Sequence, residues 1–214
     1  MTEGLSWTLI ARVSNRDEKH WTWGSGWWKY NMTDAKGETT DPLDDWDMIS
    51  PAFWLVGGNE FMITRSDDPH TAPLLQTTDN CLDERTFRDK IRTSKAGKEH
   101  NKCGSNCNVI YRGQYEKTEG FEQANENGCS PANLQTGNKI GFWCKHRSTS
   151  NHGTRAVMMI GAGGKGCSGA DHGIGIGIQY DDYDDDDDDD GYYDFGKKAD
   201  ESPTEKYSLN LWVR

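Results

Sequence analysis

The six cysteines constrain the fold of this chain most, because the rest of the sequence is poor in core-forming residues. Only 33% of the 214 residues are hydrophobic, which predicts a modest core and a loop-rich protein. An even number of cysteines in such a chain predicts three disulfides, formed in an oxidising extracellular compartment. The cysteines are Cys81, Cys103, Cys107, Cys129, Cys144 and Cys167. The sequence alone does not choose among their possible pairings.

A zinc site is the alternative use of these cysteines. Cys103 and Cys107 are separated by Gly-Ser-Asn, a spacing that zinc sites use. A second close pair of ligands would be needed, and the nearest candidate, Cys144 with His146, has an unfavourable spacing. Disulfides are therefore the preferred interpretation. In a secreted chain the single Asn-x-Thr sequence, at Asn31, would be a glycosylation acceptor.

The formal net charge of −11 argues against nucleic acid and anionic membranes as partners, because both attract surfaces rich in Lys and Arg. Most of the excess lies in one acidic loop, residues 181–190. One interpretation is a solvated loop that repulsion between like charges keeps extended. The other is a low-affinity collector of cations, either soluble Ca²⁺ or a mineral surface. The spacing is not that of an EF-hand loop.

The length fits a single domain spanning residues 1–214. The sequence has no apolar segment typical of a membrane span or a signal peptide, so membrane insertion is not expected. Secretion is inferred from the cysteines. We therefore expect either that a signal peptide has been removed or that the chain is one domain of a longer protein.

Alternation of apolar and polar residues predicts strands at both ends of the chain. Residues 7–13 alternate loosely, and Tyr207, Leu209, Leu211 and Val213 share one face of a half-buried C-terminal strand. Both ends are therefore expected to be held in sheets. Further strands are expected at 108–111, 140–143 and 156–160, a hairpin at 53–63, and one helix at 82–91. This pattern indicates the α+β class, with many loops.

Glycine and isoleucine alternate from Gly173 to Ile178, which predicts a strand whose glycine face lies against another backbone or a large ring. A tryptophan cluster near the N-terminus has two interpretations: it belongs to an aromatic core, or it forms a surface on which a sugar stacks. The cluster comprises Trp21, Trp23, Trp27 and Trp28.

The order of several short segments carries a resemblance to a known family. The chain opens with Ser6-Trp7-Thr-Leu-Ile-Ala11, continues with Asp44-Asp45-Trp46 and Ser50-Pro51-Ala-Phe53, and closes with Tyr207 to Arg214. The most specific segment runs from Gly166-Cys167 through Asp171-His172 to Gly177. In these segments the chain resembles fibrinogen-related proteins and the intelectins (X-type lectins), and it looks most like members from corals and sea anemones. The resemblance implies a fibrinogen C-terminal-like domain of twisted, mostly antiparallel sheets with few short helices, stapled by disulfides.

The resemblance also implies a calcium site. In intelectins the segment that matches Asp171 and His172 helps to hold Ca²⁺, and two neighbouring hydroxyls of a sugar complete the coordination. Asp171 stands where the family has a histidine, and a carboxylate is the harder donor that Ca²⁺ prefers. The resemblance places further ligands at Asp181 or Asp182 and at Asn151. The alternative role of Asp171 is to turn the chain before the glycine-rich segment.

The sugar pocket departs further from the family. The family's ligand glutamate after Asn151 is replaced by His152, and a family cysteine is replaced by Gly173, so one family disulfide must be absent. The family's sugar preference is therefore not carried over. His172 remains a candidate ligand contact, and the candidates for aromatic walls are Tyr180, Tyr192 and Tyr193.

The expected function is that of a secreted, calcium-dependent carbohydrate-binding module whose partners are glycans or glycoproteins. No enzymatic activity is expected, because the six histidines lie in no nucleophile or zinc-protease motif. The alternative is a structural or adhesive extracellular-matrix domain that assembles with itself, with protein partners or with mineral.

Overall fold

The computed structural model describes residues 6–14, 34–38, 41–68, 70, 73–93, 104–111, 139–145, 155–160, 172–174 and 206–214. For 92–93, 104–106, 111, 139–145, 155–160 and 172–174 it describes the backbone alone. The statements below concern these residues.

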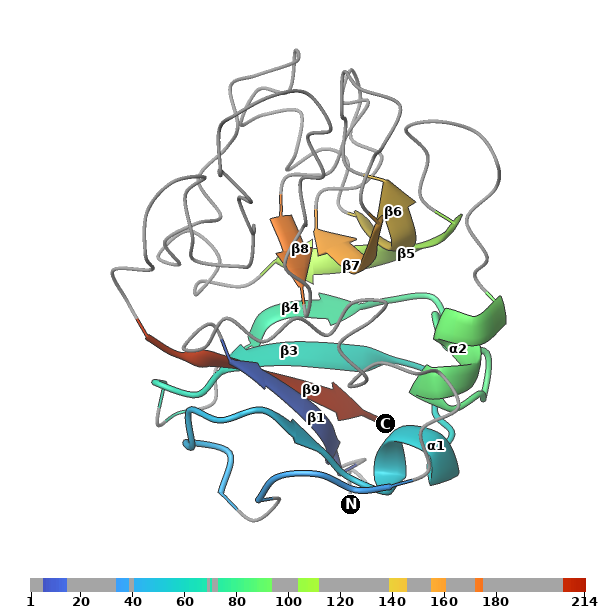
Figure 1. Cartoon of the computed structure of the whole chain (residues 1–214). Coiled ribbons are helices and arrows are strands. Elements are labelled where there is room, and N and C mark those ends of the chain that lie inside the picture. Colours follow the sequence, from blue (N-terminus) through green and yellow to red (C-terminus); the bar gives the residue numbers. More distant parts are fainter. Residues whose placement is uncertain are drawn as a thin grey trace, which may run out of the picture.

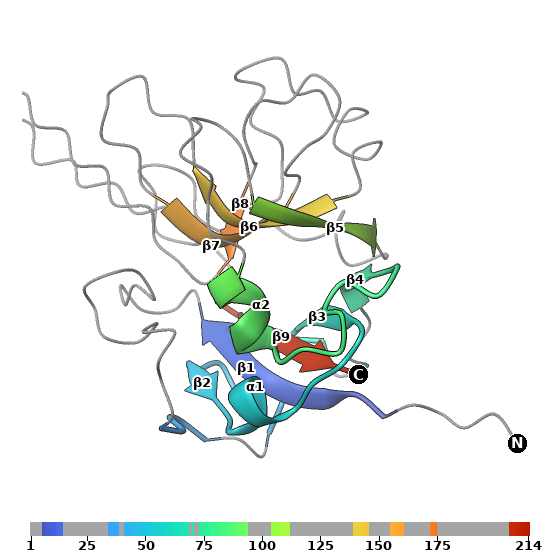
Figure 2. The same ribbon diagram turned by 90° about the vertical axis from the view of Figure 1, so that its right-hand side faces the viewer.

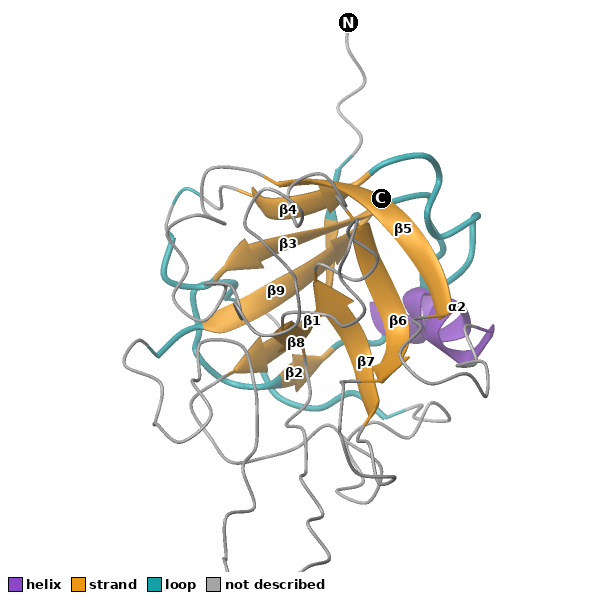
Figure 3. Ribbon diagram, turned by 90° about the horizontal axis from the view of Figure 1, so that it is seen from above, coloured by secondary structure: helices purple, strands orange, loops and turns teal. Residues whose placement is uncertain are grey.

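The described strands form one nine-stranded sheet in which every paired neighbour is antiparallel (Figure 1). The strands are β1 (Thr8–Ser14), β2 (Met48–Ile49), β3 (Phe61–Arg65), β4 (Pro73–Thr77), β5 (Gly104–Tyr111), β6 (Lys139–Lys145), β7 (Arg155–Ile160), β8 (His172–Ile174) and β9 (Ser208–Val213). Their order across the sheet is β2-β1-β9-β3-β4-β5-β6-β7-β8. The strand direction turns along this order, so that β6 and β7 run across β3 and β9 (Figure 3). The predicted mostly antiparallel architecture with few short helices is therefore confirmed.

Both terminal strands are held in the sheet, as the sequence predicted, and the structure shows that they lie side by side. β9 pairs with β1 on one side, where Thr8 lies opposite Val213, and with β3 on the other, where Phe61 also lies opposite Val213. The backbone of Arg214 continues the pairing, since its N–H donates to the Glu60 carbonyl at 3.1 Å. A side-chain carbon on Gly58 would lie 2.5 Å from the Arg214 carbonyl oxygen, so only glycine fits beside this terminus.

One face of the sheet carries the apolar core. Tyr207, Leu209, Leu211 and Val213 are all fully buried, as their alternation predicted. Phe87 links this core to the helices α1 (Ala52–Leu55) and α2 (Phe87–Thr93), which lie side by side in Figure 2. Its ring centroid is 5.6 Å from that of Phe53 in α1 and 5.3 Å from that of Phe61 in β3. Most of the other buried apolar residues of the described core are aliphatic, so the phenylalanine contacts join a largely aliphatic core to the two helices.

The hairpin predicted at 53–63 is wrong in its first half. Residues Ala52–Leu55 form the short helix α1 rather than a strand, and Pro51 begins it with helical backbone angles. Proline suits the start of a helix because its φ is already near the helical value. A short apolar run such as Phe53 to Val56 does not by itself distinguish a strand from a buried helix.

The helix predicted at 82–91 starts five residues later, at Phe87. Asp83 and Glu84 have φ of 56° and 60°, which no residue inside a right-handed helix adopts. Thr86 then caps the helix, because its Oγ1 accepts a hydrogen bond from the Asp89 N–H at 3.1 Å.

One predicted disulfide is present, between Cys81 and Cys107, with the two Cα atoms 5.4 Å apart. It ties the turn before α2 to β5. Cys144 lies in β6, where the backbone alone is described. Cys103, Cys129 and Cys167 lie outside the described residues, so the other two disulfides stay a prediction without assigned partners.

Candidate functional site

The predicted calcium and sugar site is described at one residue only. The backbone of His172 begins β8 and lies opposite Ile160 of β7. β8 is the last strand in the order of the sheet, so this residue lies at a sheet edge. The other predicted ligands and ring contacts lie outside the described residues: Asn151, Asp171, Tyr180, Asp181, Asp182, Tyr192 and Tyr193, as do the acidic loop at 181–190, the tryptophan cluster and Asn31.

The glycine-rich strand is described in part. β8 covers His172–Ile174, and Gly173 lies opposite Met159 in the antiparallel pairing with β7. The strand predicted for this segment is therefore confirmed over its first residues, while 175–178 lie outside the described part. Within the part of the chain that the structure describes, no group of three or more His, Cys, Asp or Glu residues could hold a metal ion.

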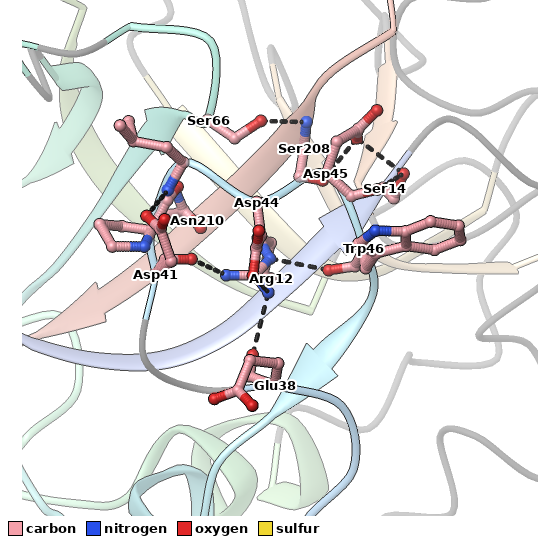
Figure 4. Close-up of polar contacts among 12 residues, drawn as sticks. Arg12, Ser14, Glu38, Asp41, Asp44, Asp45, Trp46, Ser66, Ser208 and Asn210 are labelled. Carbon is pink, nitrogen blue, oxygen red and sulfur yellow. Dashed lines mark hydrogen bonds and ion pairs between the residues drawn. The ribbon is translucent and has the colours of Figure 1, made fainter.

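A different polar cluster lies on the second face of the sheet, beneath a loop that we call the Arg12 loop (residues 34–38 and 41–47). Arg12 extends from β1, and its side chain is fully buried. Its guanidinium donates to three backbone carbonyls of the loop, those of Trp46 at 2.7 Å, Glu38 at 2.9 Å and Asp41 (Figure 4). The Asp44 carboxylate lies 3.6 Å away. One buried side chain therefore holds the backbone of the loop at three points.

Burial and neighbouring carboxylates shift the pKa of the Arg12 guanidinium in opposite directions. Burial lowers the pKa of Arg12 from its ordinary value, and the carboxylates of Asp44 and Asp41 oppose this by raising it. Arginine starts from so high a pKa that it stays charged at neutral pH. The planar group also supplies its donors in a fixed fork, which suits several carbonyls at once better than a lysine ammonium does.

Two further carboxylates join the loop to the sheet. Asp45 Oδ1 accepts hydrogen bonds from the hydroxyls of Ser14 at 2.9 Å and Ser208 at 2.8 Å. Asp47 Oδ1 accepts one from the Ser14 backbone N–H at 2.8 Å. Next to this row, Asn210 donates from Nδ2 to the Pro42 carbonyl at 2.7 Å. Residues from both terminal strands thus converge on one loop (Figure 4).

This burial corrects the prediction that the C-terminal strand is half-buried. Ser208 and Asn210 point to the face opposite the apolar core, yet both are fully buried. Buried polar groups are stable only when they are hydrogen-bonded, and the Arg12 loop supplies partners to both residues. The sequence reasoning missed the cluster, because polar positions that alternate with apolar ones usually face solvent. The only sequence signal was the density of aspartates between residues 41 and 47.

The polar groups inside this cluster hold the loop against the sheet. Its guanidinium and two of its carboxylates are engaged with backbone groups and hydroxyls, which fixes the loop in place. Its outer surface is different. The Trp46 indole points away from Arg12 (Figure 4), and as whole residues Trp46 is 55% and Leu43 47% exposed. The residues Glu38 and Asp41 are also exposed.

No protein-family model matches the chain, and no curated protein matches it significantly. No helix in the described residues is long and apolar enough to cross a membrane.

Proposed function

We propose that this protein is a secreted, non-enzymatic, calcium-dependent glycan-binding module of the fibrinogen-related, intelectin-like type. The resemblance of the segment Gly166 to Gly177 motivates the proposal. The supporting observation is that His172 begins the edge strand β8, so Asp171 comes directly before a strand at the border of the sheet. Loops that enter and leave the strands of a rigid sheet are common sites of ligand binding.

The proposed donor set suits Ca²⁺. Asp171, Asp181, Asp182 and Asn151 would offer carboxylate and amide oxygens, the ligands that Ca²⁺ prefers, and His172 would add a ring nitrogen. Such an ion accepts more oxygen ligands than this set supplies, which leaves positions for two hydroxyls of a sugar. A neutral glycan bound in this way keeps its polar groups paired. The Cys81–Cys107 disulfide fits an oxidising, extracellular compartment, and glycoproteins are the natural partners there.

The test is a glycan array in millimolar Ca²⁺, repeated with chelator, together with calorimetric titration of Ca²⁺. We expect Asp171→Ala to weaken Ca²⁺ binding by about tenfold or more, since removal of a group that supports a metal site already has an effect of this size. The matched control is Asp186→Ala, which removes a carboxylate from the acidic loop. Equal affinity in the wild type and Asp171→Ala would refute the site.

A structural or adhesive matrix role is the second candidate, and the acidic run at 181–190 favours it. Its carboxylates would gather cations or contact mineral without a defined sugar pocket. Two results would support this role instead. The array would show no glycan binding with or without chelator, and the protein would self-associate on a sizing column to the same extent with and without sugars.

A further inference from the structure

We propose that the Asp41–Pro42 peptide bond of the Arg12 loop is a self-cleavage site in mild acid, where the Asp41 carboxylate is the nucleophile and the Arg12 guanidinium stabilises the attacked carbonyl. The inference does not depend on the proposed glycan site. It rests on the residue types at the bond, on the hydrogen bonds that hold it, and on the buried cation beside it.

The two residue types make this bond easier to hydrolyse than most peptide bonds. An aspartate carboxylate can attack its own carbonyl carbon, because the attack closes a five-membered ring. The proline nitrogen belongs to a tertiary amide, and it leaves as a secondary amine once it is protonated. The sequence contains two such bonds, Asp41–Pro42 and Asp68–Pro69. Their surroundings in the fold therefore decide which of them is cleaved.

The nucleophile is held beside the bond that it attacks. Asp41 Oδ1 accepts a hydrogen bond from the Leu43 N–H at 2.8 Å. The ring that this hydrogen bond closes includes the Asp41 carbonyl carbon and the Pro42 nitrogen, so the carboxylate stays close to both atoms. Asp41 is also exposed, so water has access to complete the hydrolysis.

The Arg12 guanidinium is placed to stabilise the negative charge that develops during the attack. It donates a hydrogen bond to the Asp41 carbonyl oxygen, the atom that becomes an oxyanion (Figure 4). The Arg12 side chain is fully buried, and the carbonyls of Trp46 and Glu38 fix it at 2.7 and 2.9 Å. A charged donor that is already in position, and screened little by water, lowers the barrier without reorganisation.

The charges around the guanidinium keep this donor in place in acid. Burial lowers the pKa of Arg12, and four carboxylates of the loop raise it. They belong to Asp44, Asp41, Asp45 and Asp47. β9 faces the loop with the uncharged side chains of Ser208 and Asn210. Because arginine keeps its proton in acid, the donor persists under the conditions that protonate the leaving nitrogen.

The cleavage balances as the hydrolysis of one peptide bond in two steps. A carboxylate oxygen of Asp41 bonds to its own carbonyl carbon, and the C–N bond to Pro42 breaks as the nitrogen takes a proton from solvent. A cyclic anhydride on Asp41 and a secondary amine on Pro42 result. Water then opens the anhydride, which leaves Asp41 with its side-chain carboxylate and a new C-terminal carboxylate.

The two pieces should stay together after cleavage. The Pro42 carbonyl accepts a hydrogen bond from Asn210 Nδ2 at 2.7 Å, and Asn210 is fully buried. Among the described residues Asn210 Oδ1 has no hydrogen-bond partner, so this amide also offers an acceptor for the new amine of Pro42. The piece 1–41 keeps β1, which pairs with β9. All six cysteines follow Pro42 in the sequence, so no disulfide joins the two pieces.

The test incubates the full-length protein in mildly acidic buffer and follows its fragments by denaturing electrophoresis and intact mass. We expect the pieces 1–41 and 42–214, and N-terminal sequencing of the larger one should begin Pro-Leu-Asp. Cleavage at Asp41–Pro42 should be at least about tenfold faster than at Asp68–Pro69, since one preorganised oxyanion donor contributes about 10²–10³-fold in enzymes. Equal rates at the two bonds would show general acid lability and overturn the proposal.

The same protein in urea is the control for the fold. Unfolding separates Arg12 from the Asp41 carbonyl, so cleavage at Asp41–Pro42 should slow by about tenfold or more and approach the rate at Asp68–Pro69. A rate at Asp41–Pro42 that is unchanged or higher in urea would mean that the fold protects this bond, and the proposal would be wrong. This comparison needs no substitution, so it decides the question even if variants of Arg12 do not fold.

Substitutions then separate the two roles. Asp41→Asn removes the nucleophile but keeps a side-chain oxygen for the Leu43 N–H, and it should abolish the cleavage. The matched control is Asp83→Asn, which removes a carboxylate from an exposed ion pair and should leave the rate unchanged. Arg12→Lys keeps the charge but loses the fork of donors, so cleavage should slow about tenfold. Undiminished cleavage in Arg12→Lys with a native unfolding midpoint would overturn the role of the guanidinium.

Discussion

Arg12 shows how a single residue decides the structure of a whole loop. Burial of a guanidinium removes its hydration, and the loss is offset only if each donor finds a partner. In this protein most of the partners are backbone carbonyls rather than carboxylates, since the nearest carboxylate oxygen is 3.6 Å away. The interaction is therefore a set of charge-assisted hydrogen bonds, supported by the nearby negative charge.

Replacement of Arg12 should therefore strongly destabilise the protein. We expect Arg12→Met to lower the free energy of unfolding by about 3–5 kcal/mol, because three loop carbonyls and the Asp44 carboxylate lose their partner. Urea unfolding followed by tryptophan fluorescence measures the change. Arg85→Met is the matched control, since Arg85 forms an exposed ion pair with Asp83 at 3.1 Å, and it should change stability by less than about 1 kcal/mol. Similar losses in both variants would contradict the role of Arg12.

At the scale of the element, the segment before α2 is defined by its backbone. Two consecutive pairs of residues, Asp79-Asn80 and Asp83-Glu84, have positive φ. Aspartate and asparagine adopt this conformation more readily than most residues, whereas glutamate has no such advantage. The turn at 82–85 also closes a hydrogen bond from the Arg85 N–H to the Leu82 carbonyl at 3.0 Å. The residue at which α2 begins is thus determined by the strained residues that precede the helix.

Relief of this strain should stabilise the protein. We expect Glu84→Gly to raise the free energy of unfolding by about 0.5–1 kcal/mol, because glycine adopts φ of 60° without a steric penalty. Glu84→Ala is the control, since it removes the same carboxylate but keeps the Cβ atom that causes the strain. Thermal unfolding of the two variants separates the effects. A gain in both would point to the charge of Glu84 rather than to its backbone.

The elements also show what the sequence can and cannot predict. β1, β5, β6, β7 and β9 were predicted because their apolar residues are numerous or alternate with polar ones. α1 was mistaken for a strand because a four-residue helix is too short to show a helical period. The start of α2 was missed because the residue types of Asp83 and Glu84 do not indicate that their φ angles are positive. The candidate calcium site at Asp171 was inferred from a family resemblance and stays a prediction.

The burial of the polar face of the sheet could not be predicted from the sequence, for a different reason. Nothing in the local pattern around Arg12, Ser14, Ser208 or Asn210 distinguishes a residue that faces solvent from one that faces a loop. Only the tertiary contact between the Arg12 loop and both terminal strands makes the difference. Contacts between residues so far apart in sequence leave no periodic signal.

For the molecule as a whole, the Cys81–Cys107 disulfide closes a loop with a sequence separation of 26 residues. We expect Cys81→Ser with Cys107→Ser to lower the free energy of unfolding by about 3 kcal/mol, largely by freeing the unfolded chain. Chemical denaturation measures this, and non-reducing peptide mapping should find the two cysteines linked in the wild type. The control is Asn108→Ser, beside Cys107 on the exposed side. A variant as stable as the wild type would show that the bridge constrains little.

The pairing of β1 with β9 also has a consequence for biosynthesis. The ribosome makes these neighbours at opposite ends of the sequence, since Thr8 lies opposite Val213. At a usual translation speed, roughly 10–40 s separate the two strands. Throughout that interval the edge of β1 that β9 later covers is open to other chains. Unpaired strand edges associate readily with other chains, so we expect a translational pause between β1 and β9 to increase aggregation of the nascent protein.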